Sequence, residues 1–269
     1  MIRIPDAVLP APANGLLEQY QAEVDGQSNY ADRVAAAKSL FSRRNKRTNP
    51  AFAAVRDTLT RMCRGLGRCM YCEDAPADEV EHHSPKDLYP ELVFVWRNYL
   101  YACGPCNGPK NNRFAVIDPS NARLIDVSRL RDTPVVPQAA GAPALIDPRR
   151  EDPFDFLMLD LRDTFQLTPL HVPQTPEYLR AEYTIRVLRL NERDLPVAAR
   201  ADAFGGYRAR LREFVQQPEA GASPSDLARL GNGFRTAPHA TVWAEMKRQQ
   251  QHLPELAELF AQAPEALAF

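Results

Sequence analysis

The segments C-M-Y-C at 69–72 and C-G-P-C-N-G-P-K at 103–110 decide the fold of this 269-residue chain. Each segment carries a Cys-x-x-Cys pair, and four thiolates in two such pairs are typical of a tetrahedral structural Zn²⁺ site. We therefore predict one zinc ion held by Cys69, Cys72, Cys103 and Cys106. A metal of this kind stabilises a segment whose apolar core is too small to fold alone.

The composition is that of an ordinary globular protein, with 45% hydrophobic and 25% charged residues. No stretch approaches the roughly 20 apolar residues of a membrane span, so we expect no membrane association. The first ten residues lack the basic start and apolar run of a signal peptide. Because four of the five cysteines stand in close pairs, a reducing compartment is expected, and the cytoplasm is the predicted location.

The formal net charge of −1 conceals one strongly basic stretch. Residues 43–68 have a local charge of +7, since only Asp57 opposes eight basic residues: Arg43, Arg44, Lys46, Arg47, Arg56, Arg61, Arg64 and Arg68. A basic run that leads into the first cysteine pair favours a phosphate-rich ligand. A solvated helix face remains an equal alternative.

Periodicity and capping residues predict a mixed secondary structure. The chain from 115 to 153 is rich in proline and should be mostly extended. The remaining predictions are helices at 14–41 (broken at 26–29), 50–64, 175–190, 194–217 (interrupted or weakened by Gly205-Gly206) and 239–262, strands at 79–83 and about 92–96, a short helix starting near Cys106 or Asn107, and a β-hairpin at 154–172.

Between the cysteine pairs stand E-H-H-S-P at 81–85 and W-R-N-Y-L at 96–100. Together with C-M-Y-C and C-G-P-C-N-G-P-K, these motifs resemble the HNH endonuclease family in order and spacing. The resemblance runs from Cys69 to Lys110, so it defines a module and not the whole chain. It implies a ββα-metal core, in which a zinc-stapled β-hairpin is followed by a helix.

The resemblance also implies roles for individual residues. His82 occupies the position of the general base, since a neutral imidazole can take a proton from water near physiological pH. Glu81 and Asn107 stand at the positions that ligate a catalytic Mg²⁺ or Mn²⁺, and their oxygen atoms suit such hard cations. Asn98 matches the asparagine that braces the loop carrying the histidine. The family more often has Asp in place of Glu81 and His in place of Asn107.

Further positions receive weaker assignments. Lys110 can neutralise a phosphate beside the scissile bond, and Arg113 can add to this. His83 should face away from His82, because successive side chains of a strand alternate, and is expected to be structural. Cys63 is expected to be a buried helix thiol and not a zinc ligand.

Two segments further along are similar to the tail of bacterial HNH proteins from retron-associated and Septu-type anti-phage systems. They are A-L-I-D-P-R-R-E-D-P at 144–153 and T-I-R-V-L-R-L-N-E-R-D-L at 184–195. This resemblance implies a partner ATPase. The arginines of the two helices predicted at 175–190 and 194–217 could face such a partner or flanking DNA, or could form the solvated face of a scaffold.

The sequence therefore predicts an α+β protein, with a zinc-stapled ββα-metal HNH core embedded in a mostly α-helical chain that carries a small extra β-hairpin. We expect a helical N-terminal region at 1–62, the nuclease module at 63–118 and a mostly helical C-terminal region at 119–269 for partner or DNA contact. The expected function is metal-dependent cleavage of DNA in anti-phage defence, leaving 5′-phosphate and 3′-hydroxyl ends. A non-catalytic zinc-stapled binding module and an HNH-type ribonuclease remain the alternatives.

Overall fold

Three helices form the N-terminal region of the computed structural model, which describes residues 1–65, 67–217 and 223–269. They are α1 (Ala11–Asp25), α2 (Tyr30–Arg44) and α3 (Pro50–Met62). The side chain of Asn29 accepts a hydrogen bond from the backbone N–H of Asp32 and so caps α2, and Asn49 caps α3 in the same manner. The predicted break at 26–29 and the predicted start of α3 are both confirmed.

An antiparallel hairpin and a short helix follow. Strand β1 (Glu79–His82) pairs with β2 (Tyr99–Ala102), with Glu79 opposite Ala102 and His82 opposite Tyr99. Helix α4 (Gly104–Lys110) follows directly. The prediction of a strand near 92–96 was wrong, because this apolar stretch lies in the long connection of the hairpin between two 3₁₀ turns, Pro90–Leu92 and Trp96–Asn98. The helix also begins earlier than predicted, with Pro105 in its first turn.

Small strands fill the centre of the chain. Strand β3 (Ala115–Ile117) lies between β4 (Leu124–Asp126) and β5 (Ala142–Pro143), and the rest of 115–153 is mostly irregular. Strands β6 (Leu157–Leu159) and β7 (Leu167–Pro169) form the predicted extra hairpin. The chain thus has an α+β architecture.

The C-terminal helices are α5 (Pro176–Val187), α6 (Asp194–Gln216), α7 (Pro224–Thr236), α8 (Ala240–Gln249) and α9 (Pro254–Gln262). Thr175 caps α5 as predicted. Two predictions were wrong and one helix was missed. Helix α6 runs unbroken through Gly205-Gly206, because its buried residues Tyr207, Leu211 and Phe214 hold it by packing. Helix α7, which starts with a Ser223–Asp226 capping box, was missed, and the helix predicted at 239–262 is two helices separated before Pro254.

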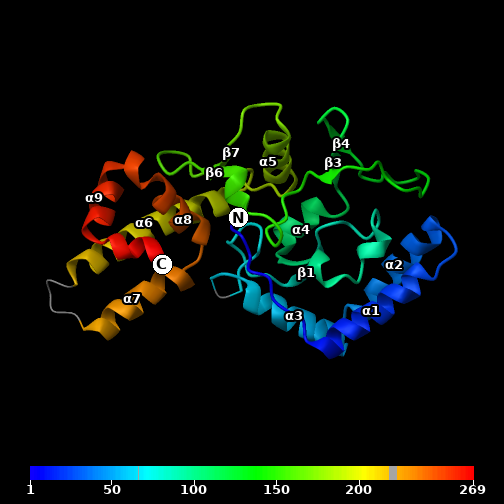
Figure 1. Cartoon of the computed structure of the whole chain (residues 1–269). Coiled ribbons are helices and arrows are strands. Elements are labelled where there is room, and N and C mark those ends of the chain that lie inside the picture. The colour runs from blue at the N-terminus through cyan, green and yellow to red at the C-terminus, as the bar shows by residue number, and fades with distance from the viewer. Residues whose placement is uncertain (66, 218–222) are drawn as a thin grey trace.

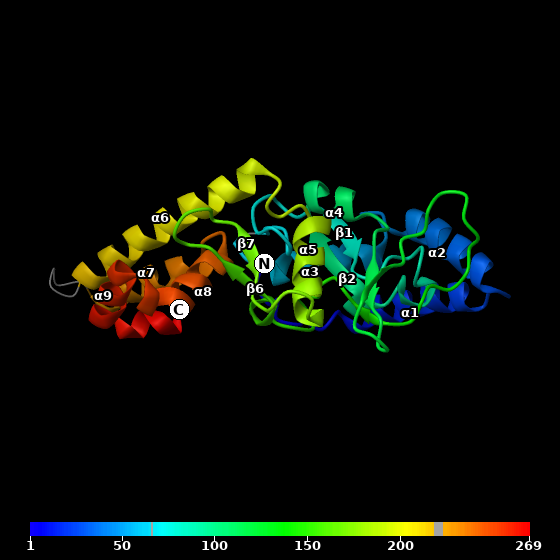
Figure 2. The same ribbon diagram turned by 90° about the horizontal axis from the view of Figure 1, so that it is seen from above.

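The elements form an elongated molecule in which α1 and α2 lie at one end and α6–α9 at the other, with α3, β1, β2 and α4 between them (Figures 1 and 2). Buried apolar side chains from all three parts join in one cluster. Phe52 of α3, for example, lies 6.0 Å from the ring of Tyr99 on β2. The boundaries at 62 and 118 remain a prediction. Within the described residues, no helix combines the length and apolar character needed to cross a membrane.

Candidate functional site

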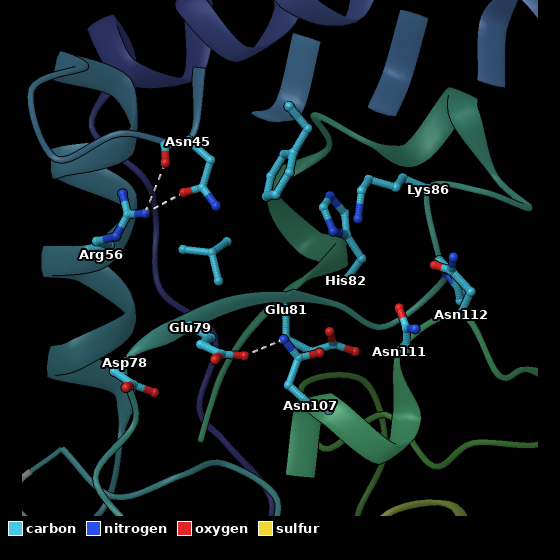
Figure 3. Close-up of a pocket in the computed structure, with 14 residues that line it drawn as sticks. Asn45, Arg56, Asp78, Glu79, Glu81, His82, Lys86, Asn107, Asn111 and Asn112 are labelled. Atoms are coloured by element: carbon cyan, nitrogen blue, oxygen red, sulfur yellow. Dashed lines mark hydrogen bonds between the residues drawn. The ribbon is translucent and has the colours of Figure 1, made fainter. Parts of the chain in front are cut away.

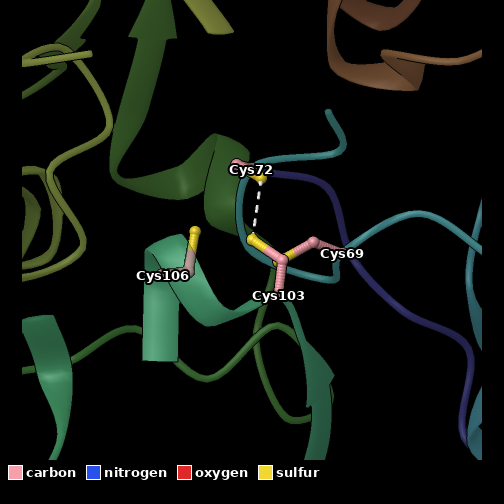
Figure 4. Close-up of side chains that lie close together, drawn as sticks. All are labelled: Cys69, Cys72, Cys103 and Cys106. Carbon is pink, nitrogen blue, oxygen red and sulfur yellow. Dashed lines mark hydrogen bonds between the residues drawn. The ribbon is translucent and has the colours of Figure 1, made fainter. Parts of the chain in front are cut away.

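The four paired cysteines come together as predicted. Their sulfur atoms all lie within 4.8 Å of one another, and all four residues are buried (Figure 4). Cys69 and Cys72 belong to the loop before β1, Cys103 caps α4, and Cys106 lies on the first turn of α4. Cys63 is not part of the cluster. A compact, buried set of four thiols fits the tetrahedral coordination of zinc, so the cluster could hold a structural Zn²⁺.

A charged side chain from the C-terminal region contacts this cluster. Arg193, the residue before α6, donates a hydrogen bond from Nη2 to Sγ of Cys106 over 3.2 Å. Four thiolates around one Zn²⁺ carry a net charge of −2, and a guanidinium group in contact offsets part of it. The motif at 184–195 therefore contributes to the cysteine cluster through Arg193, a contact that the sequence did not predict.

A cavity of about 480 Å³ opens beside β1 and α4 (Figure 3). Its walls combine the hairpin with side chains from the distant helices α2 and α3. The lining residues are Phe41, Asn45, Arg56, Asp78, Glu79, Val80, Glu81, His82, Pro85, Lys86, Asn107, Gly108, Asn111 and Asn112. Three of the predicted site residues, Glu81, His82 and Asn107, thus meet in one cavity.

His82 is held rigidly at this cavity. Its Nε2 atom lies 2.9 Å from the carbonyl oxygen of Val93, and its ring packs against Phe41 and Tyr99 at centroid distances of 4.4 and 5.3 Å. Because a carbonyl can only accept, Nε2 carries the proton of the neutral ring and Nδ1 is left as a base. Burial lowers the pKa of His82 well below its usual value, and the nearby positive charge of Lys86 lowers it further. The imidazole is therefore neutral at physiological pH.

Glu81 and Lys110 form a buried ion pair. Burial raises the pKa of Glu81, and the positive charge of Lys110 opposes this rise. The ammonium group of Lys110 contacts the Oε1 atom of Glu81, which has no other polar partner among the described residues. Lys110 also donates to the backbone carbonyl of His82 over 2.7 Å, is fully buried and does not line the cavity. Its ammonium group is therefore bound by Glu81 and the His82 carbonyl and is not directed at a ligand in the cavity.

Asn107 and Asn98 occupy different places. Asn107 lies at the cavity and donates from Nδ2 to the exposed carboxylate of Glu79 over 2.6 Å, which leaves its Oδ1 atom available (Figure 3). Asn98 is buried and bridges the connection of the hairpin. It accepts from the N–H of Ser84 and donates to the carbonyls of Ser84 and Leu92, over 2.8–3.0 Å. Asn98 thus holds the loop that follows His82.

Two remaining sequence assignments lie outside the cavity. Arg113 is exposed and is not among the lining residues. His83 is buried on the other side of the hairpin, where its Nε2 atom lies 3.0 Å from the carbonyl of Leu145 and its ring meets Phe114 edge-on. His82 and His83 therefore have matched surroundings, each buried and bonded to one carbonyl, but only His82 reaches the cavity.

Sequence reasoning missed the cationic lining of the cavity. Lys86 lies next to His82, has no ion-pair partner among the described residues and has its pKa lowered by burial (Figure 3). Arg56 reaches the cavity from α3 and donates to Asn45. The signal for Lys86 was its place directly after the E-H-H-S-P motif at 81–85, and Arg56 belongs to the basic run at 43–68.

Much of the predicted arginine surface of α5 and α6 is used inside the molecule. Arg200 is buried and donates to the carbonyls of Leu190 and Phe165. Other arginines form ion pairs with glutamates of neighbouring segments, namely Arg180 with Glu151, and Arg208 and Arg212 with Glu255. These contacts favour a scaffold role for a large part of this surface.

Comparison with known proteins gives a partial similarity. The chain is 44% identical over 57 residues to the Septu protein PtuB of Bacillus thuringiensis, a match that covers 19% of this chain and 22% of that protein. The predicted similarity to a Septu-type protein is thus present over about a fifth of each chain. No family model matches the chain. No solved structure matches it either.

Proposed function

We propose that the chain is a metal-dependent endonuclease of the HNH type that hydrolyses phosphodiester bonds of DNA. The observation that carries this proposal is the state of His82, a neutral imidazole whose Nε2 atom is fixed on the Val93 carbonyl. A base fixed at one nitrogen presents the other to a cavity that also contains Glu81 and Asn107. A binding module would need the cysteines but not this constellation.

The protein supplies the proton transfer in this reaction. His82 takes a proton at Nδ1 from a water molecule, whose oxygen attacks phosphorus while the bond from phosphorus to the 3′ oxygen breaks. The 3′ oxygen leaves with the bonding electron pair and takes a proton from solvent, and His82 later releases its proton to solvent. The products are a 5′-phosphate and a 3′-hydroxyl. A base of this kind contributes about 10²–10⁴-fold to the rate, and a depressed pKa keeps it unprotonated below neutral pH.

The lining fits a hard divalent cation. Glu81 brings a carboxylate to the cavity, and the Oδ1 atom of Asn107 is left available when Nδ2 binds Glu79. Glu81 and Asn107 would therefore hold Mg²⁺ or Mn²⁺, with Glu79 close to Asn107. When bound, such an ion acts as a Lewis acid toward the phosphate and its leaving oxygen.

Two side chains are better placed than Lys110 to contact a phosphate. Lys110 is committed to Glu81 and the His82 carbonyl, whereas Lys86 and Arg56 line the open cavity. Lys86 has no anionic partner within the described chain, so a phosphate would supply one. We assign the phosphate contact to Lys86 and Arg56, and to Lys110 the role of fixing the Glu81 carboxylate.

The similarity to a Septu protein supports a role in anti-phage defence, with an ATPase as the expected partner. The C-terminal helices are the proposed docking region. An exposed arginine such as Arg186 or Arg210 forms no ion pair among the described residues and is open to a partner.

Incubation with nucleic acid tests the proposal. Purified protein is mixed with supercoiled plasmid and, separately, with RNA, with Mg²⁺, Mn²⁺ or no added metal, and the His82→Ala variant is run alongside. Plasmid cleavage that requires the metal and His82 supports the proposal. Cleavage of RNA alone would identify a ribonuclease, and tight binding without cleavage by the protein and its purified ATPase partner would identify a binding module.

A further inference from the structure

A second cavity, of about 530 Å³, is lined almost wholly by arginine. Its lining residues are Arg3, Asp6, Arg97, Arg149 and Arg150. They come from three distant parts of the chain: the segment before α1, the 3₁₀ turn before β2, and the motif at 144–153. The fold therefore gathers four guanidinium groups that are far apart in sequence, at a place distinct from the cavity of His82.

Arg149 is the fixed element of this cavity. Its Nη1 atom donates to the carbonyls of Trp96 and Tyr99 over 2.8 and 2.7 Å, and its guanidinium group lies over the Trp96 ring at 4.5 Å from the centroid. The side chain is buried, yet its Nε atom has no hydrogen-bond partner among the described residues. Its Nη2 atom donates to Asp6, so the guanidinium group is held in one position at the cavity.

The charges around the cavity do not balance. A single carboxylate, that of Asp6, is shared by Arg97 and Arg149, with both distances at 2.7 Å. Arg150 pairs with Asp147, and Arg3 forms no ion pair with any described residue. Four guanidinium groups thus meet two carboxylates, which leaves a surplus of two positive charges. Arginine forks bind carboxylate and phosphate oxygens in pairs, so the surplus defines an anion site.

The lining also selects the kind of anion. The lining residues as described include no aromatic ring on which a base could stack, so the cavity recognises a phosphate group alone. Arg97 and Arg150 are open to solvent, with 69% and 60% of their side-chain surfaces exposed, as is typical of contacts to a nucleic-acid backbone. We propose that this cavity binds a backbone phosphate of nucleic acid.

The site is joined to the end of the hairpin that carries His82. Arg149 binds the carbonyl of Tyr99, and the Tyr99 ring packs against His82. A nucleic acid bound at Arg97 and Arg150 would be anchored on the same hairpin as the cavity that we assign to cleavage. This anchoring deepens the proposed nuclease function and rests on it, but binding at the arginine cavity can be measured without cleavage.

The test measures binding in a background that cannot cleave. The His82→Ala protein and its Arg97→Gln/Arg150→Gln derivative are titrated with a fluorescein-labelled DNA duplex of about 20 base pairs over a range of salt concentrations, and anisotropy gives the Kd. We expect the Kd to rise about tenfold at low salt, and the slope of log K against log salt to fall by about 2, since each neutralised phosphate contributes about 0.9. The matched control is Arg189→Gln/Arg229→Gln, which removes the same charge from two exposed arginines elsewhere and should leave the Kd unchanged.

Each result has a defined meaning. Equal Kd values for the two double variants would overturn the proposal. Inorganic phosphate provides the second arm. If it raises the melting temperature of wild type but not of Arg97→Gln/Arg150→Gln, while duplex binding is equal in both, the cavity takes free phosphate and the backbone assignment is wrong. If the wild-type protein binds the duplex through these arginines but cleaves DNA neither alone nor with its ATPase partner, the nuclease proposal fails and the phosphate site stands.

Discussion

The cysteine cluster and the His82 cavity occupy the same hairpin and helix, but they differ in almost every physical respect. The cluster consists of four identical ligands, buried and within 4.8 Å of one another. The cavity combines a buried carboxylate, a half-exposed amide and a neutral imidazole, and it opens to solvent. Structural zinc sites are closed, whereas catalytic metal sites keep a position open for water or substrate.

The difference separates stability from chemistry. The cluster joins three segments of the chain: the loop before β1, helix α4 and, through Arg193, the start of α6. The cavity instead holds Lys86, whose positive charge has no ion-pair partner among the described residues. Changes at the cluster should therefore affect folding first, and changes at the cavity should affect catalysis first.

Removal of one cysteine should have the largest effect. The Cys106→Ser variant should lose its zinc and become insoluble or protease-sensitive, because the binding energy of a structural zinc is part of the folding energy. Elemental analysis and limited proteolysis measure both outcomes. Cys63→Ser, at a half-buried cysteine outside the cluster, is the control and should retain zinc. Zinc absent from the wild-type protein purified without chelators would contradict the assignment of the cluster.

Replacing each of the two histidines by alanine tests whether the cavity is the site of cleavage. His82→Ala should lower the cleavage rate by about 10²–10⁴-fold with zinc content unchanged, because it removes the proposed general base. His83→Ala removes an equally buried imidazole that also bonds a backbone carbonyl, so it controls for loss of packing. It should leave cleavage per folded molecule near that of wild type. An inactive His83→Ala beside an active His82→Ala would show that the wrong histidine has been assigned.

Two lysines sharpen the contrast between stability and chemistry. Lys110→Met should destabilise the fold by about 3–5 kcal/mol, because it leaves the buried Glu81 carboxylate without its partner. Lys86→Gln should change the free energy of unfolding little and raise the KM for DNA. Urea unfolding and steady-state kinetics separate the two effects. A stable Lys110→Met protein with a raised KM for DNA would show that Lys110, and not Lys86, contacts the phosphate.

The smallest expected effect is at the contact between Arg193 and Cys106. Loss of a hydrogen bond to a metal ligand typically lowers metal affinity by about 10–100-fold, so Arg193→Gln should release zinc faster to a chromogenic chelator. Arg189 lies four residues earlier in the turn between α5 and α6 and is exposed, so Arg189→Gln serves as the control. Identical release rates for both variants would show that Arg193 does not stabilise the zinc site.

The fold was predictable where the signals are local. Asn49-Pro50 and Thr175-Pro176 mark helix starts that capping chemistry alone identifies. The strand at 99–102 was missed because the preceding apolar stretch at 92–96 looks equally strand-like, and only tertiary packing decides between them. Helix α6 continues through two glycines because its buried aromatic and aliphatic residues outweigh their low helix propensity.

The site was predictable in part for the same reason. The cysteine pairs have a spacing that itself specifies a metal site, and Glu81, His82 and Asn107 lie close together in a recognisable motif. Arg56 lines the cavity from α3, and Arg193 contacts Cys106 although the two residues are 87 positions apart in the sequence. Neither contact therefore leaves a local pattern in the sequence. The burial of Lys110 was also hidden, because a lysine at the end of a short helix is normally exposed.

The central claim is that one protein holds two metals with separate tasks, and chelation followed by metal return tests it most directly. The protein is treated with EDTA at a concentration that spares a buried four-thiolate site, and its zinc content and its cleavage of supercoiled plasmid are then measured. We predict that one zinc per chain remains, that cleavage is lost, and that Mg²⁺ or Mn²⁺ restores it. Cleavage that persists without a free divalent cation, or that returns only with zinc, would contradict the account.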